Sequence, residues 1–294
     1  MSIFQGVHIS LVTPMTKEHK VDYKRLGEIC DWLIAKGVSG IIAAGPVGEY
    51  ATLSKEERKK VVETAVTASQ GRVPVTAGTG AASTADTIYW AEHALDNGAD
   101  GILALPPVGY KPLENEVLTH YERLSKVGIP MIVFNNPRDF GIDLTPELLD
   151  KMSQFENILA IKEFSGDIRR IHEILEKTSL DVLVGVDDLS MEGALCGATG
   201  WTSGVANALP ELSVKLFNLA RESKREEARQ LYRDLVPLFR YDAGPQLIQA
   251  IKYMMELADQ PAGPTRSPRL PLKSEDYDMI RDLFQKATLT AVNP

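Results

Sequence analysis

The segment "NILAIKEFSGD" (157–167) places a lysine where a charged group is costly. The four residues before Lys162 are all apolar, which is typical of a strand that runs buried through a parallel sheet. A lysine amine in apolar surroundings loses its charge easily, and the neutral amine attacks carbonyl carbon to form a Schiff base. The alternative is a structural lysine in a buried ion pair with Glu163 or Asp187, and these residues alone leave both open.

Short apolar runs alternate with amphipathic segments along most of the chain. The runs have the length of strands and are Val7–Pro14, Val38–Gly45, Val73–Gly80, Gly101–Pro107, Ile129–Pro137, Ile158–Phe164, Val182–Asp188 and Gly200–Asn207. Helical patterns lie between them, as in Ser54–Gln70, where Ser54 and Glu57 predict a capping box, and in Ser83–Asn97. The chain thus contains eight strand-and-helix units.

Eight such units favour a closed parallel barrel over a doubly wound sheet, which would usually have a glycine fingerprint after its first strand. The stretch after the first run, "VTPMTKEH" (12–19), has none. One helix-to-strand turn recurs as "KGVSGI" (36–41), "NGADGI" (97–102) and "CGATGW" (196–201). In each, the first glycine can end a helix and the second can begin a strand. We therefore predict an α/β fold, a (β/α)8 TIM barrel formed by residues 1–222.

Three further helical patterns follow, and they are Lys224–Arg240, Pro245–Asp259 and Ser274–Ala287. A turn-rich stretch, 259–272, joins the last two. We interpret residues 223–294 as a C-terminal helical extension packed on the barrel. A separate functional domain is not expected, because these pieces contain no polar constellation of their own.

Active sites of such barrels lie at the C-terminal ends of the strands. The segments predicted there include "GPVGE" (45–49), "PPVGY" (106–110), "FNNPRD" (134–139), "KEFSGD" (162–167), "GVDD" (185–188) and "SGVAN" (203–207). We expect Lys162 to point into the mouth that they form. Asp187 and Asp188 are interpreted as turn residues that cap the next helix, in preference to a cation site or groups that orient Lys162.

These motifs, in this order, resemble those of the dihydrodipicolinate synthase and N-acetylneuraminate lyase family of class I aldolases. "HISLVTPM" (8–15) is similar to the opening strand of that family, and "GPVGEYATLSKEER" (45–58) is similar to its G-T-T-G-E segment. "FNNP" (134–137) is similar to its Y-N-x-P motif, and "IKEFSGD" (161–167) to its strand with the Schiff-base lysine. "SPRLPL" (267–272) is similar to its C-terminal motif. The resemblance covers essentially the whole chain. It implies a barrel with C-terminal helices, Lys162 as the Schiff-base lysine and a 2-oxo acid such as pyruvate as substrate. It also implies no metal or organic cofactor, and a homotetramer or homodimer.

The loop that binds the substrate carboxylate in that family differs here. Pro46 has no N–H to donate and Val47 has no hydroxyl, although the amides of Val47 and Gly48 could still bind a carboxylate. We also predict that Gly185 and Val205, from the segments after the seventh and eighth strands, bind the substrate. Arg138 and Asp139 complete the predicted substrate-binding residues.

Phe134 falls where the family has a tyrosine that moves protons in Schiff-base formation, and phenylalanine cannot move one. Tyr110 and Tyr50, on neighbouring rim loops, are the candidate replacements, and each is equally well explained as a packing residue. Arg138 falls one place before the arginine that holds the synthase's second substrate, and Asp139 occupies that place. Four departures in one constellation suggest a changed reaction.

The amino-acid composition limits the classes of protein to which the chain can belong. The chain has 294 residues, of which 44% are hydrophobic and 24% charged, as is ordinary for a globular enzyme. A net charge of −8, with both signs mixed along the chain, argues against nucleic acid as a partner. Two cysteines cannot form a disulfide framework, the histidines lack metal-ligand spacing, and no apolar run is long enough to cross a membrane. Because the N-terminus lacks a signal segment, we expect a cytoplasmic protein without a membrane partner.

Three functions remain open from the residues. The leading hypothesis is a Schiff-base-forming lyase (aldolase, dehydratase or deaminase) acting on pyruvate, a related 2-oxo acid or a pyrroline carboxylate. The segment "FNNPRDFGIDLTPE" (134–147) resembles 1-pyrroline-4-hydroxy-2-carboxylate deaminase. The second hypothesis is a divergent 4-hydroxy-tetrahydrodipicolinate synthase that condenses pyruvate with aspartate semialdehyde. The third is a non-catalytic barrel that binds a 2-oxo acid or a protein partner, and the presence of Lys162 at so awkward a position argues against it.

Overall fold

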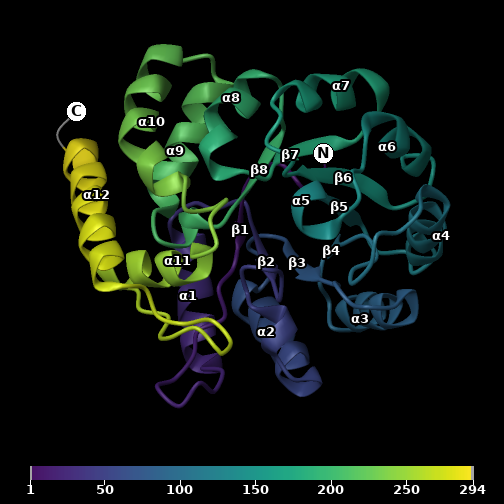
Figure 1. The fold of residues 1–294 in the computed structure, drawn as a ribbon, viewed down its shortest axis with the longest axis horizontal. Helices are drawn as coiled ribbons and strands as arrows, with labels where there is room; N and C mark the ends of the chain where they lie inside the picture. Colours follow the sequence, from purple (N-terminus) through teal and green to yellow (C-terminus); the bar gives the residue numbers. More distant parts are fainter. Residues whose placement is uncertain (1, 293–294) are drawn as a thin grey trace.

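Eight parallel strands form the centre of the computed structural model, which describes residues 2–292. The strands are β1 (Gly6–Ser10), β2 (Gly40–Ala43), β3 (Val75–Gly78), β4 (Gly101–Ala104), β5 (Met131–Asn135), β6 (Ile158–Glu163), β7 (Asp181–Val184) and β8 (Gly200–Ser203). Each strand pairs with the next in chain order, and β8 pairs with β1 to close the barrel (Figure 1). The predicted (β/α)8 TIM-barrel fold class is confirmed, and the strands lie almost wholly within the predicted apolar runs.

Helices lie between the strands in the chain, most of them around the outside of the barrel. They are α1 (Tyr23–Ala35), α2 (Lys55–Ser69), α3 (Thr84–Asp96), α4 (Glu114–Ser125), α5 (Pro137–Phe140), α6 (Pro146–Met152), α7 (Arg169–Lys177), α8 (Ser190–Leu195) and α9 (Pro210–Arg221), with single 3₁₀ turns η1 (Tyr50–Thr52), η2 (Asp187–Leu189) and η3 (Val205–Asn207). The capping box predicted for α2 is present, because the Glu57 amide donates to Ser54 Oγ (3.1 Å) and the Ser54 amide donates to Glu57 Oε2 (2.9 Å).

The repeated glycine turn has the geometry that its sequence predicts. Its first glycines, Gly37, Gly98 and Gly197, have φ of +84°, +76° and +105°, the left-handed region that other residues rarely adopt. The second glycine of the first turn, Gly40, begins β2 against the buried His8 ring, where a Cβ would lie 2.2 Å from Nδ1. The turn therefore ends a helix and begins a strand in the same six residues.

Apolar side chains from alternating strand positions fill the interior of the barrel. Ile132, Phe134, Ala160 and Leu183 belong to this buried cluster. Side chains two residues apart on a strand share a face, so Lys162 follows Ala160 on the inner side. The register pairs Lys162 with Phe134 on β5 and with Leu183 on β7. Lys162 is thus the inward-facing residue immediately above the apolar filling.

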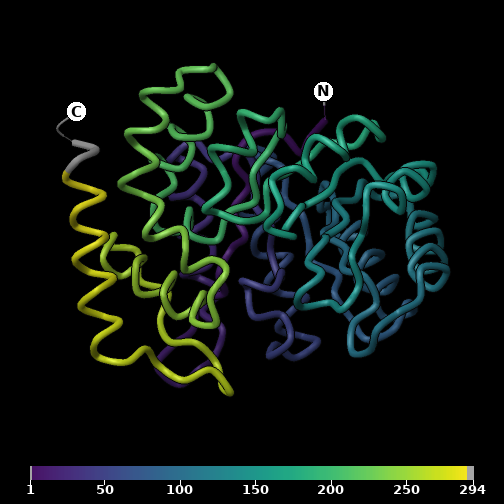
Figure 2. Tube along the Cα trace, turned by 45° about the horizontal axis from the view of Figure 1, so that its top comes forward, coloured from purple at the N-terminus to yellow at the C-terminus, as the bar shows by residue number. Residues whose placement is uncertain are grey.

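Three helices follow the eighth unit, and they are α10 (Arg225–Phe239), α11 (Leu247–Leu257) and α12 (Ser274–Val292). They lie on one side of the barrel, and both ribbon and tube views place α12 at the outer edge of that side (Figures 1 and 2). Ile280, Phe284 and Ala287 are buried, so α12 covers apolar surface. The division into residues 1–222 and 223–294 stays a prediction.

A buried ion pair ties this C-terminal region to the loop after β2. Lys252 on α11 donates to Glu49 Oε1 at 2.9 Å, with side chains only 4% and 0% exposed. Lys252 also donates to the carbonyl of Pro264, and the amide of Arg266 donates to Glu49 Oε2. These bonds satisfy both charges, as burial requires, and they fix the loop that contains Pro46 and Val47.

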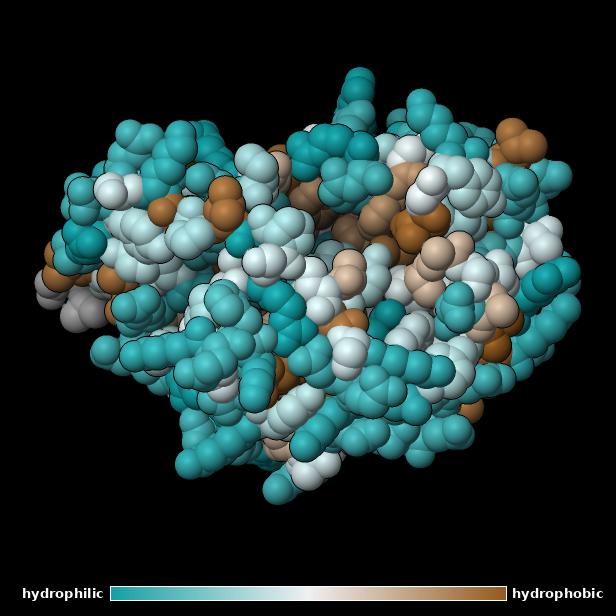
Figure 3. All heavy atoms as spheres, turned by 60° about the horizontal axis from the view of Figure 1, so that its bottom comes forward, coloured by the Kyte–Doolittle hydropathy of each residue, from teal (hydrophilic) through white to brown (hydrophobic). Residues whose placement is uncertain are grey.

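Much of the molecular surface is hydrophilic. The space-filling view shows charged and polar residues over most of one face, with apolar residues in scattered groups and in a hollow near its upper middle (Figure 3). Within residues 2–292, no helix combines the length and apolarity needed to span a membrane. In that same range, no three His, Cys, Asp or Glu side chains are grouped so that they could hold a metal ion.

Candidate active site

A cavity of about 430 Å³ lies at the C-terminal ends of the strands. Its walls come from the loops after β2, β5 and β6 and from the segment between α10 and α11. The lining residues are Pro46, Val47, Phe134, Asn136, Arg138, Asp139, Phe140, Lys162, Phe164, Asp242, Ala243, Gly244, Pro245 and Leu247. The cavity thus brings together three barrel loops and one segment from outside the barrel.

Lys162 stands at the bottom of this cavity among aromatic rings. Its Nζ lies 4.5 Å from the ring centre of Phe134 and 5.6 Å from that of Phe164. The residue is only 5% exposed. Burial lowers the pKa of Lys162 below its usual 10.5, and the negative charges of Asp242 and Asp187 oppose that shift. Burial therefore shifts the amine towards its neutral form, while the ring faces can stabilise a cation formed at the same nitrogen.

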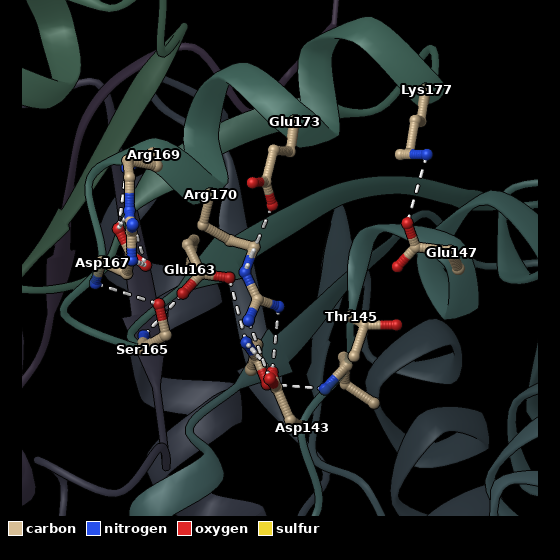
Figure 4. A network of polar contacts seen from close by, with 12 residues as sticks. Asp143, Thr145, Glu147, Glu163, Ser165, Asp167, Arg169, Arg170, Glu173 and Lys177 are labelled. Carbon is tan, nitrogen blue, oxygen red and sulfur yellow. Dashed lines mark hydrogen bonds and ion pairs between the residues drawn. The ribbon is translucent and has the colours of Figure 1, made fainter.

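Glu163 faces away from the cavity, because neighbouring residues on a strand point to opposite sides. Its carboxylate accepts from the amide of Ser165 (2.6 Å) and from Asn135 Nδ2 (3.0 Å). Asn135 also donates to Asp143, which binds both terminal nitrogens of Arg170 (2.8 and 3.1 Å; Figure 4). Glu163 is thus satisfied by other partners and forms no ion pair with Lys162. This excludes one of the two ion pairs that could have explained Lys162 as a structural residue. The network holds β5, β6 and α7 together beneath the mouth.

Two carboxyl groups lie close enough to Lys162 to act on its charge. Asp187 is wholly buried and accepts from Trp201 Nε1 (2.9 Å) and from the amide of Val205 (2.8 Å). Asp242, which is 5% exposed, accepts at Oδ2 from the amide of Asp187 (3.1 Å). Burial raises the pKa of Asp187 to about 6 and raises that of Asp242 well above its usual value. The interpretation of Asp187 as a helix-capping residue was wrong, because its side chain is directed into this buried cluster.

The loop of Pro46, Val47 and Gly48 lies where the sequence predicted it. Pro46 and Val47 line the cavity, whereas Gly48 packs behind it, where a Cβ would lie 2.9 Å from the carbonyl oxygen of Leu11. Within the described residues, the amides of Val47 and Gly48 donate to no protein acceptor. Buried amides normally have a partner, and that an anionic ligand group supplies it here stays a prediction.

Gly185 and Val205 do not line the cavity, although each supports it. A Cβ on Gly185 would lie 2.7 Å from the carbonyl oxygen of Glu163 and 3.1 Å from Cγ of Lys162. Gly185 therefore leaves the space that the lysine side chain needs. Val205 is fully buried, and its amide is used by Asp187. Direct contact of these two with a substrate stays a prediction.

Neither tyrosine proposed as a proton donor lines the cavity. Tyr110 is 52% exposed and borders a second hollow of about 340 Å³, together with Ser83, Thr84 and His120. Tyr50 packs against Gly80 and lies 5.0 Å from the Arg58 guanidinium carbon, measured from the ring centre. In the described chain, Tyr110 lines a different hollow from Lys162. Its catalytic role stays a prediction that this position does not support.

Arg138 and Asp139 lie on the short helix α5 at the rim. Both line the cavity, and their side chains are 62% and 60% exposed. Asp139 accepts from Asn136 Nδ2 at 2.8 Å, so its carboxylate occupies the rim. Arg138 donates across the mouth to the carbonyl of Ala243 (3.2 Å). The rim thus has one guanidinium, bound to the C-terminal segment, and one carboxylate.

The lining residues outside the segments predicted at the mouth are Phe140 and the segment from Asp242 to Leu247. Asn136 and Phe164 lie within predicted segments but were not singled out as site residues. Asp242 contributes a carboxyl to the cavity from the turn between α10 and α11, and the sequence did not indicate this contribution. The only local signal is "YDAG" (241–244) between two helical patterns, and an aspartate before a glycine there predicts a turn.

Comparison with known proteins is consistent with this geometry. Residues 3–287 match the model of the Dihydrodipicolinate synthetase family. The chain belongs to this family. It is 35% identical to the 4-hydroxy-tetrahydrodipicolinate synthase of Methanothrix thermoacetophila, over 97% of both chains. It is 33% identical to the enzyme of the same name from Methanosarcina barkeri, over 97% of this chain and 98% of the relative.

Solved structures of family members have the same fold. Dihydrodipicolinate synthase from Aquifex aeolicus is 30% identical and superposes with a TM-score of 0.91, over 97% of this chain and 99% of that one. The chloride-inhibited synthase from Acinetobacter baumannii, complexed with pyruvate, is 29% identical with a TM-score of 0.91 over the same shares. Family members are class I aldolase lyases with a Schiff-base lysine, and they are typically oligomers that act on small molecules. The protein is therefore an enzyme of the Schiff-base lyase class.

Proposed function

We propose that the protein is a lyase in which Lys162 forms a Schiff base with pyruvate, a related 2-oxo acid or a pyrroline carboxylate. The observation that carries this proposal is a lysine, 5% exposed, at the end of β6 and open to a cavity of about 430 Å³. Burial lowers the pKa of this amine, and the neutral form is the one that attacks a carbonyl carbon. The amide of Val47, at the cavity wall, would receive the substrate carboxylate together with the amide of the next residue, Gly48.

The chemistry follows from these groups. Lys162 Nζ attacks C2 of the 2-oxo acid, and loss of water gives a protonated imine. The imine withdraws electrons from C3, so a bond at C3 can break and leave an enamine on the enzyme. Phe134 and Phe164 lie over the nitrogen and stabilise the cationic imine without exchanging protons. Hydrolysis then releases the product and the free lysine.

Covalent trapping tests the proposal. Pyruvate or another 2-oxo acid, with borohydride, should add to one lysine, and peptide mapping should locate it in "AIKEFSGD" (160–167). Lys162→Met should abolish the adduct. Lys151→Met, at an exposed ion pair with Glu114, is the matched control and should leave it unchanged. Modification of another lysine, or of none across a broad set of 2-oxo acids and pyrroline carboxylates, would refute the proposal.

The reaction that we favour is dehydration, deamination or retro-aldol cleavage. A synthase must also hold the carboxylate of aspartate semialdehyde at the mouth, and here Asp139 occupies the rim. The like charge of Asp139 disfavours a second carboxylate there, and solvent screens part of this repulsion because the Asp139 side chain is 60% exposed. The deaminase reaction on 1-pyrroline-4-hydroxy-2-carboxylate is the first to assay, because of the likeness in residues 134–147.

The second candidate is a divergent 4-hydroxy-tetrahydrodipicolinate synthase. It is favoured by relatives of that name at 35% and 33% identity over nearly the whole chain. A coupled assay with pyruvate and aspartate semialdehyde distinguishes the two. We expect little turnover, and efficient condensation would reverse the order of the candidates.

We also propose a homotetramer or homodimer as the working assembly. Light scattering on the eluting protein should give two or four times the mass of the chain. A monomer that still traps pyruvate would show that assembly is not needed for the first step.

A further inference from the structure

We propose that Asp242, a residue from outside the barrel, is the group that moves protons at the reacting atoms of the Lys162 adduct. The inference rests on the proposed function, since it names the acid and base of that same site. Phe134 has no hydroxyl and cannot transfer protons during Schiff-base formation. The proposal gives that role to a residue of the loop between α10 and α11.

The position of Asp242 gives it access to the adduct. It lines the cavity together with Lys162 and is itself only 5% exposed. One carboxyl oxygen, Oδ2, accepts from the amide of Asp187 and is thereby anchored. The other, Oδ1, lies over Gly204, where a Cβ would come within 3.0 Å of it. Within residues 2–292 no protein donor binds Oδ1, so this oxygen is free to exchange a proton with a ligand.

The other lining residues cannot take this role. None of the described side chains that line the cavity is a tyrosine, serine, threonine, cysteine or histidine. Arg138 offers only hydrogen-bond donors, and Asp139 lies at the open rim with its side chain 60% exposed. Asp242 is therefore the buried acid that remains beside the amine.

The charges around Asp242 prepare it for proton transfer. Lys162, Asp187 and Asp188 act on it, and Asp187 is fixed as an acceptor by Trp201 and Val205. Burial and the charge of Asp187 raise the pKa of Asp242, whereas Lys162 and the Asp187 amide lower it. Two buried carboxyls beside one lysine favour a shared proton, because both cannot ionise without cost.

The proposed steps balance. Asp242, protonated, gives its proton to the hydroxyl of the carbinolamine, which leaves as water while the nitrogen lone pair forms the imine. The carboxylate so produced then removes a proton from C3. The C–H electron pair becomes the C2–C3 double bond of the enamine, and the imine electrons return to nitrogen. Asp242 is again protonated and can deliver that proton to a leaving group or back to C3.

Deuterium exchange of pyruvate separates this role from adduct formation. In D₂O, enamine formation replaces the methyl protons of pyruvate, which proton NMR follows directly. Asp242→Asn keeps the shape and the bond from the Asp187 amide but cannot act as a base. We expect its trapped adduct to reach the wild-type extent after long incubation, while exchange slows by roughly 10²–10⁴-fold. Asp278→Asn, an exposed carboxylate on α12 that does not line the cavity, is the control and should exchange within about threefold of wild type.

The outcomes are distinct. Exchange at the wild-type rate in Asp242→Asn, or a wild type that traps pyruvate without exchanging its protons, overturns the role of Asp242 and leaves the Schiff-base proposal intact. A wild type that traps no 2-oxo acid refutes the proposed function itself. Circular dichroism checks folding, and Asp242→Ser replaces the asparagine variant if that variant unfolds. Asp242→Glu keeps a carboxyl and should recover at least a tenth of the exchange that Asp242→Asn loses, which a purely structural role would not.

Discussion

The Lys162 amine should respond to pH differently from a surface lysine. Burial lowers its pKa below 10.5, and the reactive neutral form exists above that pKa. The rate of borohydride-trapped adduct formation should therefore rise with pH and level off below pH 10.5. Asp187→Asn removes a negative charge that raises the pKa of Lys162, so the midpoint should move to lower pH. Intact-mass time courses between roughly pH 6 and pH 10 measure both. A midpoint at or above 10.5, or an upward shift in the variant, would contradict this account.

The contrast between Lys162 and Asp242 shows which site residues sequence can reveal. Lys162 ends an apolar run, so a local conflict between charge and burial marks it. Pro46 and Val47 follow a strand, and the barrel brings all strand ends together. Asp242 has no such mark, because its local surroundings are those of an ordinary helix-to-helix turn. Only the packing of α10 and α11 on the barrel brings it to Lys162. Asp187 was misread for the same reason, since nothing local shows that Trp201 and Val205 donate to it.

Gly185, directly after β7, leaves the space that the Lys162 side chain occupies, because glycine has no side chain. Gly185→Ala would place a Cβ 2.7 Å from the Glu163 carbonyl oxygen and 3.1 Å from Cγ of Lys162. Backbone cannot easily move aside, so we expect a loss of stability of about 1–3 kcal/mol. Displacement of the lysine should also slow trapping at least about tenfold, as expected when a nucleophile is misplaced. Gly27→Ala, in α1, has no atom closer than 4.0 Å and is the matched control. Equal trapping rates in both variants would contradict a positioning role for Gly185.

The Glu49–Lys252 pair couples the loop after β2 to α11. Lys252→Met leaves the buried Glu49 carboxylate with the Arg266 amide and with Arg269 at 3.7 Å. We expect a loss of about 3 kcal/mol or more in the free energy of unfolding, measured by denaturant titration. The exposed Lys126–Glu122 pair provides the control, since Lys126→Met should change stability by less than about 0.5 kcal/mol. Similar costs for the two variants would show that the buried pair does not anchor the loop.

The fold as a whole was accessible from the sequence because its signals repeat. The three glycine turns and the eight apolar runs each predict the same unit, and eight units close into one barrel. The C-terminal helices were also predicted, but how they share the site was not. Their contribution depends on contacts between distant segments, such as Lys252 with Glu49 and Arg138 with Ala243. Such contacts leave no periodic pattern.

Two truncations test whether the C-terminal helices belong to the same cooperative unit as the barrel. Ending the chain after Lys273 removes α12, with buried Ile280, Phe284 and Ala287, but keeps Asp242 and Lys252. We expect this protein to melt at least about 5 °C lower, because apolar faces of the remaining helices are exposed, and still to trap pyruvate.

Ending the chain after Glu222 should have a larger effect. It removes Asp242 and one wall of the cavity, together with Lys252 and Arg266, which bind Glu49. It also removes the buried apolar side chains of α10 and α11, so we expect neither a cooperative thermal transition nor a trapped adduct. Circular dichroism and intact-mass analysis measure the two properties. A 1–222 protein that melts cooperatively and traps pyruvate would instead make the barrel an independent domain, with the C-terminal helices only packed on it.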